Sequence, residues 1–92
     1  MSETRPPSPE AIALMRAWPY DDWFTEQQLA EALRRRGHEV IQSETGAYRY
    51  FGRDLVALLR EGRRRSWLLR DRRTPEFMYK RTPTGFQAGA AR

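Results

Sequence analysis

The spacing of the apolar residues changes at Gly62, and this change limits the fold more than any other feature of the chain. From Thr45 to Gly62, apolar side chains recur at helical intervals, which predicts a helix with one buried face: Tyr48, Phe51, Leu55, Leu58 and Leu59. Beyond it, residues 66–70 and 77–81 are strand-like, and residues 71–76 are typical of a turn. The pattern predicts a helix followed directly by a β-hairpin.

Two shorter helices are predicted before this one. Ser8 followed by Pro9 is typical of a helix start, with serine as the cap and proline in the first turn, and Pro19 ends that helix. Thr25 and Gln28 have the spacing of a capping box, so a second helix begins there and ends at Gly37. Residues 23–24, between the two helices, suit a brief strand.

The length of 92 residues allows one small domain. We expect a disordered N-terminus over residues 1–7 and a single domain over residues 8–82. Residues 83–92 are small and polar apart from Phe86, so we expect a flexible C-terminal tail.

This order of elements resembles the winged helix-turn-helix superfamily. Three segments carry the resemblance. TEQQLAEALRRRG is similar to the second helix of the superfamily. YRYFGRDLVALLREG is similar to its recognition helix, and SWLLRDRRTPEFMYKR is similar to its wing. The resemblance implies an α+β fold with three helices, a short first strand and a C-terminal β-hairpin wing, and it implies binding of double-stranded DNA. The segment between the second and third helices is longer than the usual turn. FGRDL before a basic hairpin also resembles domains of phage and plasmid replication proteins, which implies a small transcriptional regulator or an accessory factor of that type.

Positive charge is concentrated in the second half of the chain. Residues 1–46 carry five arginines against eight carboxylates, and residues 47–92 carry twelve basic side chains against four carboxylates, so the halves have net charges of −3 and +8. Such segregation indicates an acidic partner. All but one of the seventeen basic side chains are arginine, which fits phosphate well, although a GC-rich genome explains the same bias equally.

The predicted contact residues lie on the third helix and the hairpin. With the apolar stripe facing the core, the N-terminal half of that helix presents Arg49, Tyr50 and Arg53 to the major groove. The remaining predicted contacts, to phosphates or to a neighbouring minor groove, are Arg63, Arg64, Arg65, Arg70, Arg72, Arg73, Lys80 and Arg81.

Other interpretations fit the same residues. In one of them, the charged side chains of the helix and hairpin bind nothing, and they only keep an exposed surface solvated and protect it against aggregation. A protein partner with an acidic surface, in a transcription or replication complex, would match the same charge. Aromatic rings interleaved with arginines also fit single-stranded nucleic acid. The sequence leaves the oligomeric state open, a homodimer included.

Catalytic and metal-binding motifs are absent from the sequence. His38 is the single histidine, there is no cysteine, and no glycine-rich phosphate loop occurs, so we expect no enzyme, no metal and no cofactor. Without a long apolar run or a signal-peptide pattern, we expect no membrane partner and a cytoplasmic location, nucleoid-associated in a bacterium.

Overall fold

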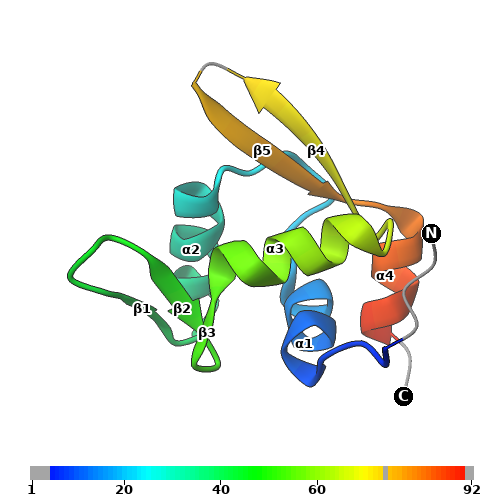
Figure 1. Cartoon of the computed structure of the whole chain (residues 1–92), viewed down its shortest axis with the longest axis horizontal. Helices are drawn as coiled ribbons and strands as arrows, with labels where there is room; N and C mark the ends of the chain where they lie inside the picture. The colour runs from blue at the N-terminus through cyan, green and yellow to red at the C-terminus, as the bar shows by residue number, and fades with distance from the viewer. Residues whose placement is uncertain (1–4, 74, 91–92) are drawn as a thin grey trace.

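A computed structural model of the chain describes residues 5–73 and 75–90 (Figure 1). The fold is α+β, with two antiparallel sheets and, in this part of the chain, four helices. The elements in chain order are α1 (Pro9–Ala17), α2 (Glu26–Arg35), β1 (Val40–Gln42), β2 (Tyr48–Tyr50), β3 (Arg53–Asp54), α3 (Leu55–Arg64), β4 (Leu68–Arg73), β5 (Glu76–Arg81) and α4 (Pro83–Ala90).

The starts of α1 and α2 are confirmed as predicted. The Ser8 hydroxyl accepts a hydrogen bond from the Ala11 N–H at 3.2 Å, with Pro9 as the first helical residue. In α2 the capping box is complete: Thr25 Oγ1 accepts from the Gln28 N–H at 3.1 Å, and Gln28 Oε1 accepts from the Thr25 N–H at 3.0 Å. Each cap satisfies backbone donors that the helix leaves unpaired, which stabilises it by about 1 kcal/mol.

The predicted third helix begins too early, because residues 40–54 form a small antiparallel sheet instead. In this sheet β1 pairs with β2, and β2 pairs with β3 across the two-residue turn Phe51–Gly52. Tyr48 and Tyr50 are both buried while Arg49 between them is exposed, which is the two-residue period of a strand. Phe51 and Gly52 have positive φ angles of 52° and 74°, which a right-handed helix excludes. The helix therefore starts at Leu55.

The predicted hairpin is confirmed, and its strands are longer than expected. β4 and β5 have six residues each, and they pair from Leu68 opposite Arg81 to Arg73 opposite Glu76. The brief strand predicted at residues 23–24 is a single bridge, in which Phe24 and Tyr79 exchange backbone hydrogen bonds of 2.9 and 2.8 Å. This bridge joins the segment between α1 and α2 to the hairpin.

Residues 83–90 form a helix, α4, where we expected a flexible tail. Thr82 caps it, since its Oγ1 accepts from the Gly85 N–H at 3.0 Å and donates to the Trp67 carbonyl oxygen at 3.0 Å. Gly85 and Gly89 lie on the face that packs against the body of the molecule. A Cβ atom at Gly85 would collide with the Trp67 carbonyl oxygen, and one at Gly89 would collide with the Arg16 backbone nitrogen. Glycine at position 89 lets α4 approach α1 closely, and glycine at position 85 lets it approach the backbone of Trp67.

The core lies between α1, α2 and α3, and the hairpin extends from it. Figure 1 shows α3 crossing the middle of the molecule, with the β4–β5 hairpin above it and α1 and α4 below. Fully buried leucines of all three helices meet there, joined by aromatic rings from the sheet and the hairpin: Leu14, Leu29, Leu33, Leu55, Leu58, Leu59, Tyr50, Trp67 and Tyr79. The outer face of α3 and the inner face of the hairpin are left at the surface.

Candidate nucleic-acid interface

The exposed face of α3 carries three arginines at its C-terminal half. Arg60, Arg63 and Arg64 follow one another at i, i+3 and i+4, so they lie on one side of the helix, while Leu58 and Leu59 are buried on the other. Arg60 and Arg63 pair with no carboxylate among the described residues. Their charge is therefore directed at solvent.

The inner face of the hairpin continues this basic surface. Because side chains alternate along a strand, Leu68, Arg70 and Arg72 of β4 share one face with Phe77 and Tyr79 of β5. Leu68 and Tyr79 are buried, which shows that this face is directed toward the helices. Farther along, the Arg70 guanidinium lies 4.2 Å from the centre of the Phe77 ring, and that of Arg72 lies 5.6 Å from it.

The two faces meet in one hollow of about 260 Å³, lined by Arg60, Arg63, Arg64, Arg70 and Tyr79. We call the exposed set around it the α3–hairpin surface: Arg60, Arg63, Arg64, Arg70, Arg72 and Phe77. Like charges brought together at a surface repel each other by about 1 kcal/mol per close pair in water, and an anion in the hollow removes this repulsion. The arrangement thus favours a polyanion that spans both elements.

Four residues of this surface were predicted from the sequence, and Arg60 and Phe77 were missed. Arg63, Arg64 and Arg70 line the hollow together, and Arg72 lies beside Arg70 on the Phe77 ring. Arg60 could have been found from its spacing to Arg63 and Arg64, since the three residues share a face opposite the leucine stripe.

The prediction that Arg49, Tyr50 and Arg53 occupy the N-terminal half of a recognition helix is wrong. All three lie in β2 and β3, before α3 begins. Arg49 Nη1 pairs with Asp54 Oδ1 at 2.9 Å, and the Tyr50 ring is only 2% exposed. Their positions are set by the sheet, although Arg53 lines a hollow together with Arg64 of α3.

Arg53 reaches back to the first helix instead. Its Nη1 pairs with Glu10 Oε1 of α1 at 3.3 Å, so part of its charge is neutralised within the fold.

Arg65 also serves the fold rather than the α3–hairpin surface. Its Nε lies 3.4 Å from Glu61 Oε2, its Nη2 donates to the Arg5 carbonyl oxygen at 2.8 Å, and its guanidinium lies 5.6 Å from the centre of the Trp67 ring. These contacts hold the end of α3 against the N-terminal segment and leave little of the side chain exposed.

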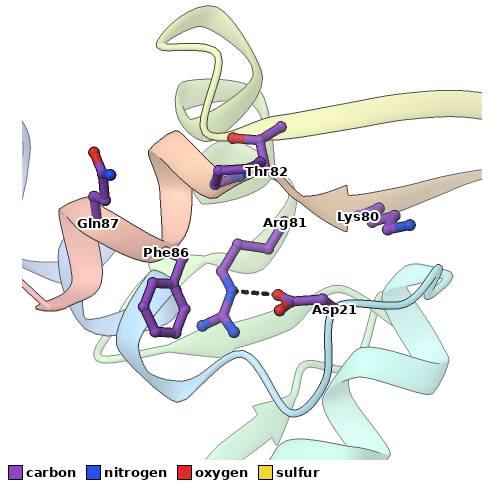
Figure 2. Close-up of a pocket in the computed structure, with 7 residues that line it drawn as sticks. Asp21, Lys80, Arg81, Thr82, Phe86 and Gln87 are labelled. Atoms are coloured by element: carbon purple, nitrogen blue, oxygen red, sulfur yellow. Dashed lines mark hydrogen bonds and ion pairs between the residues drawn. The ribbon is translucent and has the colours of Figure 1, made fainter.

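Arg81 anchors the base of the hairpin. Its Nε donates to Asp21 Oδ1 at 2.8 Å and its Nη1 donates to the Met15 carbonyl oxygen at 2.7 Å. Figure 2 shows its guanidinium lying between Asp21 and the ring of Phe86, whose centre is 4.9 Å away. Only 9% of the side chain is exposed, so its charge is taken up by α1, its following loop and α4.

One further predicted residue, Lys80, stands apart from the α3–hairpin surface. Lys80 neighbours Tyr79 on β5, so its side chain lies on the outer face of the hairpin, beside the hollow shown in Figure 2. The side chain of Arg73 lies outside the described part of the chain.

Glu61 holds the part of α3 that carries the arginines of the α3–hairpin surface against the start of α1. Its carboxylate is buried in α3 and accepts hydrogen bonds from the Ser8 N–H at 3.0 Å and the Ser8 hydroxyl at 2.9 Å. Burial by itself raises the pKa of this carboxyl, but the two hydrogen bonds and the positive charges of Arg65 and Arg53 outweigh it, so the pKa lies below its usual value of 4.5. The ionised carboxylate therefore ties the start of α1 to the arginine-bearing half of α3.

Over residues 5–73 and 75–90, no group of three or more histidine, cysteine or carboxylate side chains has the arrangement of a metal site. The helices of the same ranges include none with the length and apolar character needed to cross a membrane. Comparisons with protein-family models, with curated proteins and with solved structures found no match to this chain.

Proposed function

We propose that the protein binds double-stranded DNA through the α3–hairpin surface, as a small transcriptional regulator or a phage- or plasmid-type accessory factor. The observation that carries the proposal is the hollow where arginines of a helix and of a hairpin converge. Within the described residues Arg60, Arg63 and Arg70 pair with no carboxylate, so their charges are available to phosphates.

The shape of this surface fits a duplex. The major groove accommodates one helix, and the exposed face of α3 would present Arg60 and Arg63 to it. The six-residue strands of the hairpin extend roughly 20 Å, which suits a contact along the phosphate backbone or in an adjoining minor groove. The Phe24–Tyr79 bridge supports a winged-helix arrangement. The β1–β2–β3 sheet between α2 and α3 departs from that superfamily.

The test is the binding of a random duplex, measured by fluorescence anisotropy at several salt concentrations. Log affinity should fall linearly with log salt, by about 0.9 for each phosphate contacted. Replacing Arg63 and Arg70 by alanine should lower this slope by about 2 and weaken binding about tenfold or more per arginine, since a charge-assisted hydrogen bond contributes about 1.5–3 kcal/mol.

The matched control is the double variant Arg35→Ala with Arg49→Ala, which removes the same charge from two exposed positions that do not line the hollow of the α3–hairpin surface. It should leave the salt slope near that of the unaltered protein. Equal losses in the two double variants would mean that binding follows net charge alone, and a flat salt response would rule out the duplex proposal.

One observation favours single-stranded nucleic acid as a second candidate ligand. Phe77 is 40% exposed and is flanked by Arg70 and Arg72, and such rings can stack on bases. A single strand that binds more tightly than the duplex of the same sequence, with binding lost in Phe77→Leu, would favour this candidate over the first.

A further inference from the structure

The turn between β2 and β3 holds an exposed aromatic residue in an unfavourable backbone conformation. Phe51 and Gly52 are the two central residues of this hairpin turn, and both have positive φ angles, 52° and 74°. Turns of this kind favour asparagine or aspartate followed by glycine, because large side chains disfavour the left-handed region. Phe51 is also 64% exposed to solvent. The chain therefore keeps an exposed aromatic side chain at a position where its backbone conformation costs stability, and such strain is concentrated at functional sites.

A groove lies directly beside this phenylalanine. It has a volume of about 650 Å³ and is lined by α1, by the end of α2 and by β2, through Ala13, Arg16, Ala17, Arg36, His38, Tyr50 and Phe51. The rings of Tyr50 and Phe51 meet edge to face, with centres 4.6 Å apart, and form an apolar wall. We call this site the Phe51 groove.

The rim of the Phe51 groove is positively charged. The Nη2 of Arg36 donates to the Pro19 carbonyl oxygen at 3.0 Å, and its guanidinium lies 5.2 Å from the centre of the Tyr20 ring. Neither partner carries a net charge, so the positive charge of Arg36 is not neutralised by them. Arg16 adds a second guanidinium, whose Nε donates to the Gly89 carbonyl oxygen at 2.8 Å.

We propose that the Phe51 groove docks an acidic segment of a partner protein. The segment places an aliphatic or aromatic side chain against Phe51, whose ring rests on the buried Tyr50, and it sets a carboxylate against Arg36. Charge complementarity selects this occupant, because a second copy of this chain, with a net charge of +5, is repelled from a basic rim. In Figure 1 the β2–β3 turn and α1 lie at the lower edge and the hairpin at the upper edge, so this site is separate from the α3–hairpin surface.

The test uses two short synthetic peptides in an amide chemical-shift titration of the whole chain. The first carries aspartate and glutamate around a Phe–Leu pair, and the second has lysine in place of every acidic residue. The acidic peptide should shift the backbone amides of Arg36, His38 and Phe51 and leave those of Arg63 and Arg70 in place. The lysine peptide should shift none of these amides.

Two variants and two matched controls test the residues of the Phe51 groove. Phe51→Asn and Arg36→Glu should each weaken binding of the acidic peptide by about tenfold or more. Arg35→Glu makes the same charge change in the neighbouring position of α2, where the side chain lines a different hollow, and Ile41→Asn removes another exposed apolar side chain. Both controls should bind as the unaltered protein does.

Phe51→Asn also separates docking from a role in the fold. Because asparagine suits the left-handed turn better than phenylalanine, this variant should have a higher Tm while it loses the peptide. A lower Tm would show that Phe51 serves packing instead.

The proposal is overturned if the acidic peptide does not bind, if it binds both variants as well as it binds the controls, or if duplex DNA rather than the peptide shifts the amides of the Phe51 groove. The peptide results do not bear on DNA binding by Arg63 and Arg70, which the salt titration of the Arg63 and Arg70 variants tests by itself, so the two proposals fail separately.

Discussion

At the scale of single residues, Glu61 has the most consequential contacts in the molecule. A buried carboxylate is costly unless its oxygens are hydrogen-bonded. Glu61 satisfies this condition with the N–H and hydroxyl of Ser8, and the nearby guanidinium of Arg65 supplies an opposite charge. Ser8 in turn caps α1, so one side chain connects the first and third helices at the point where the arginines of α3 emerge.

We predict that Glu61→Gln destabilises the fold by about 1–3 kcal/mol at neutral pH, because the amide cannot accept both hydrogen bonds with the strength of a carboxylate and leaves Arg65 without its counter-charge. The free energy of unfolding in urea measures this loss. Glu31→Gln, on the exposed face of α2, is the control and should change stability by no more than about 0.5 kcal/mol.

The same residue predicts a dependence of stability on pH. The folded-state pKa of Glu61 is lowered, so its contribution to stability is fully present above the unfolded value near 4.5 and is lost as the pH falls through the lower folded value. The difference in unfolding free energy between the unaltered protein and Glu61→Gln should therefore shrink on acidification across this range. A difference that stays constant with pH would contradict this role of Glu61.

At the scale of elements, the contact of α4 with α1 depends on Gly89 of α4. We predict that Gly89→Ala destabilises the protein by about 1–3 kcal/mol, since the added methyl group meets the backbone of Arg16 and must push the helices apart. Gln87→Ala, at an exposed position of the same helix, should be neutral. Urea unfolding of the two variants measures the difference, and equal stability of both would show that α4 can shift without cost.

The same helix shows which elements the sequence could reveal. The start of α1 was found from Ser8 and Pro9, and an equivalent pair, Thr82 and Pro83, stands at the start of α4. It was overlooked because α4 has a weak apolar pattern and two glycines, which lower helix propensity. Those glycines allow close packing of α4, and this role can be seen only in the folded structure, where the segments that α4 packs against are in place. Local signals therefore identify where a helix can begin, while its persistence depends on tertiary contacts.

The start of the third helix was misjudged for a different reason. Tyr48 and Phe51 fit a helical stripe, and Tyr48 and Tyr50 fit a strand equally well, so a short apolar run does not distinguish the two. The hairpin was predicted correctly, because apolar and polar residues alternate over a longer stretch there. The positions of Arg70 and Arg72 on it were therefore predicted as well. The pairing of Arg81 with Asp21, sixty residues away, follows from tertiary structure and has no local signal.

At the scale of the whole molecule, the acidic and basic halves of the chain neutralise each other selectively. Carboxylates of the first half pair with Arg53 and Arg81 of the second half, which neutralises Arg53 in part and buries Arg81 at the base of the hairpin. The arginines of the α3–hairpin surface are left to dominate one end of the molecule. Net charge alone would not have placed the basic surface there, since it depends on which pairs the fold brings together.

This division leads to a prediction about two ligands. The two surfaces lie at opposite edges of the molecule along its 28 Å axis in Figure 1, and charges are screened over about 8 Å at physiological salt. A duplex bound at the α3–hairpin surface should therefore change the Kd of the acidic peptide for the Phe51 groove by less than about threefold, a difference of under 1 kcal/mol. Anisotropy of the labelled peptide, with and without saturating duplex, measures this. Competition between the two ligands would show that they share one surface.

The close approach of α4 to α1 also constrains how this fold can vary over evolution. A position that admits no Cβ atom accepts only glycine, so Gly85 and Gly89 should be the most restricted sites of the C-terminal segment. The exposed arginines are not restricted in this way, because a lysine at the same position keeps the positive charge that attracts a polyanion. Distant relatives of this chain should therefore be easier to recognise by two glycines four residues apart after a Thr–Pro pair than by their basic residues.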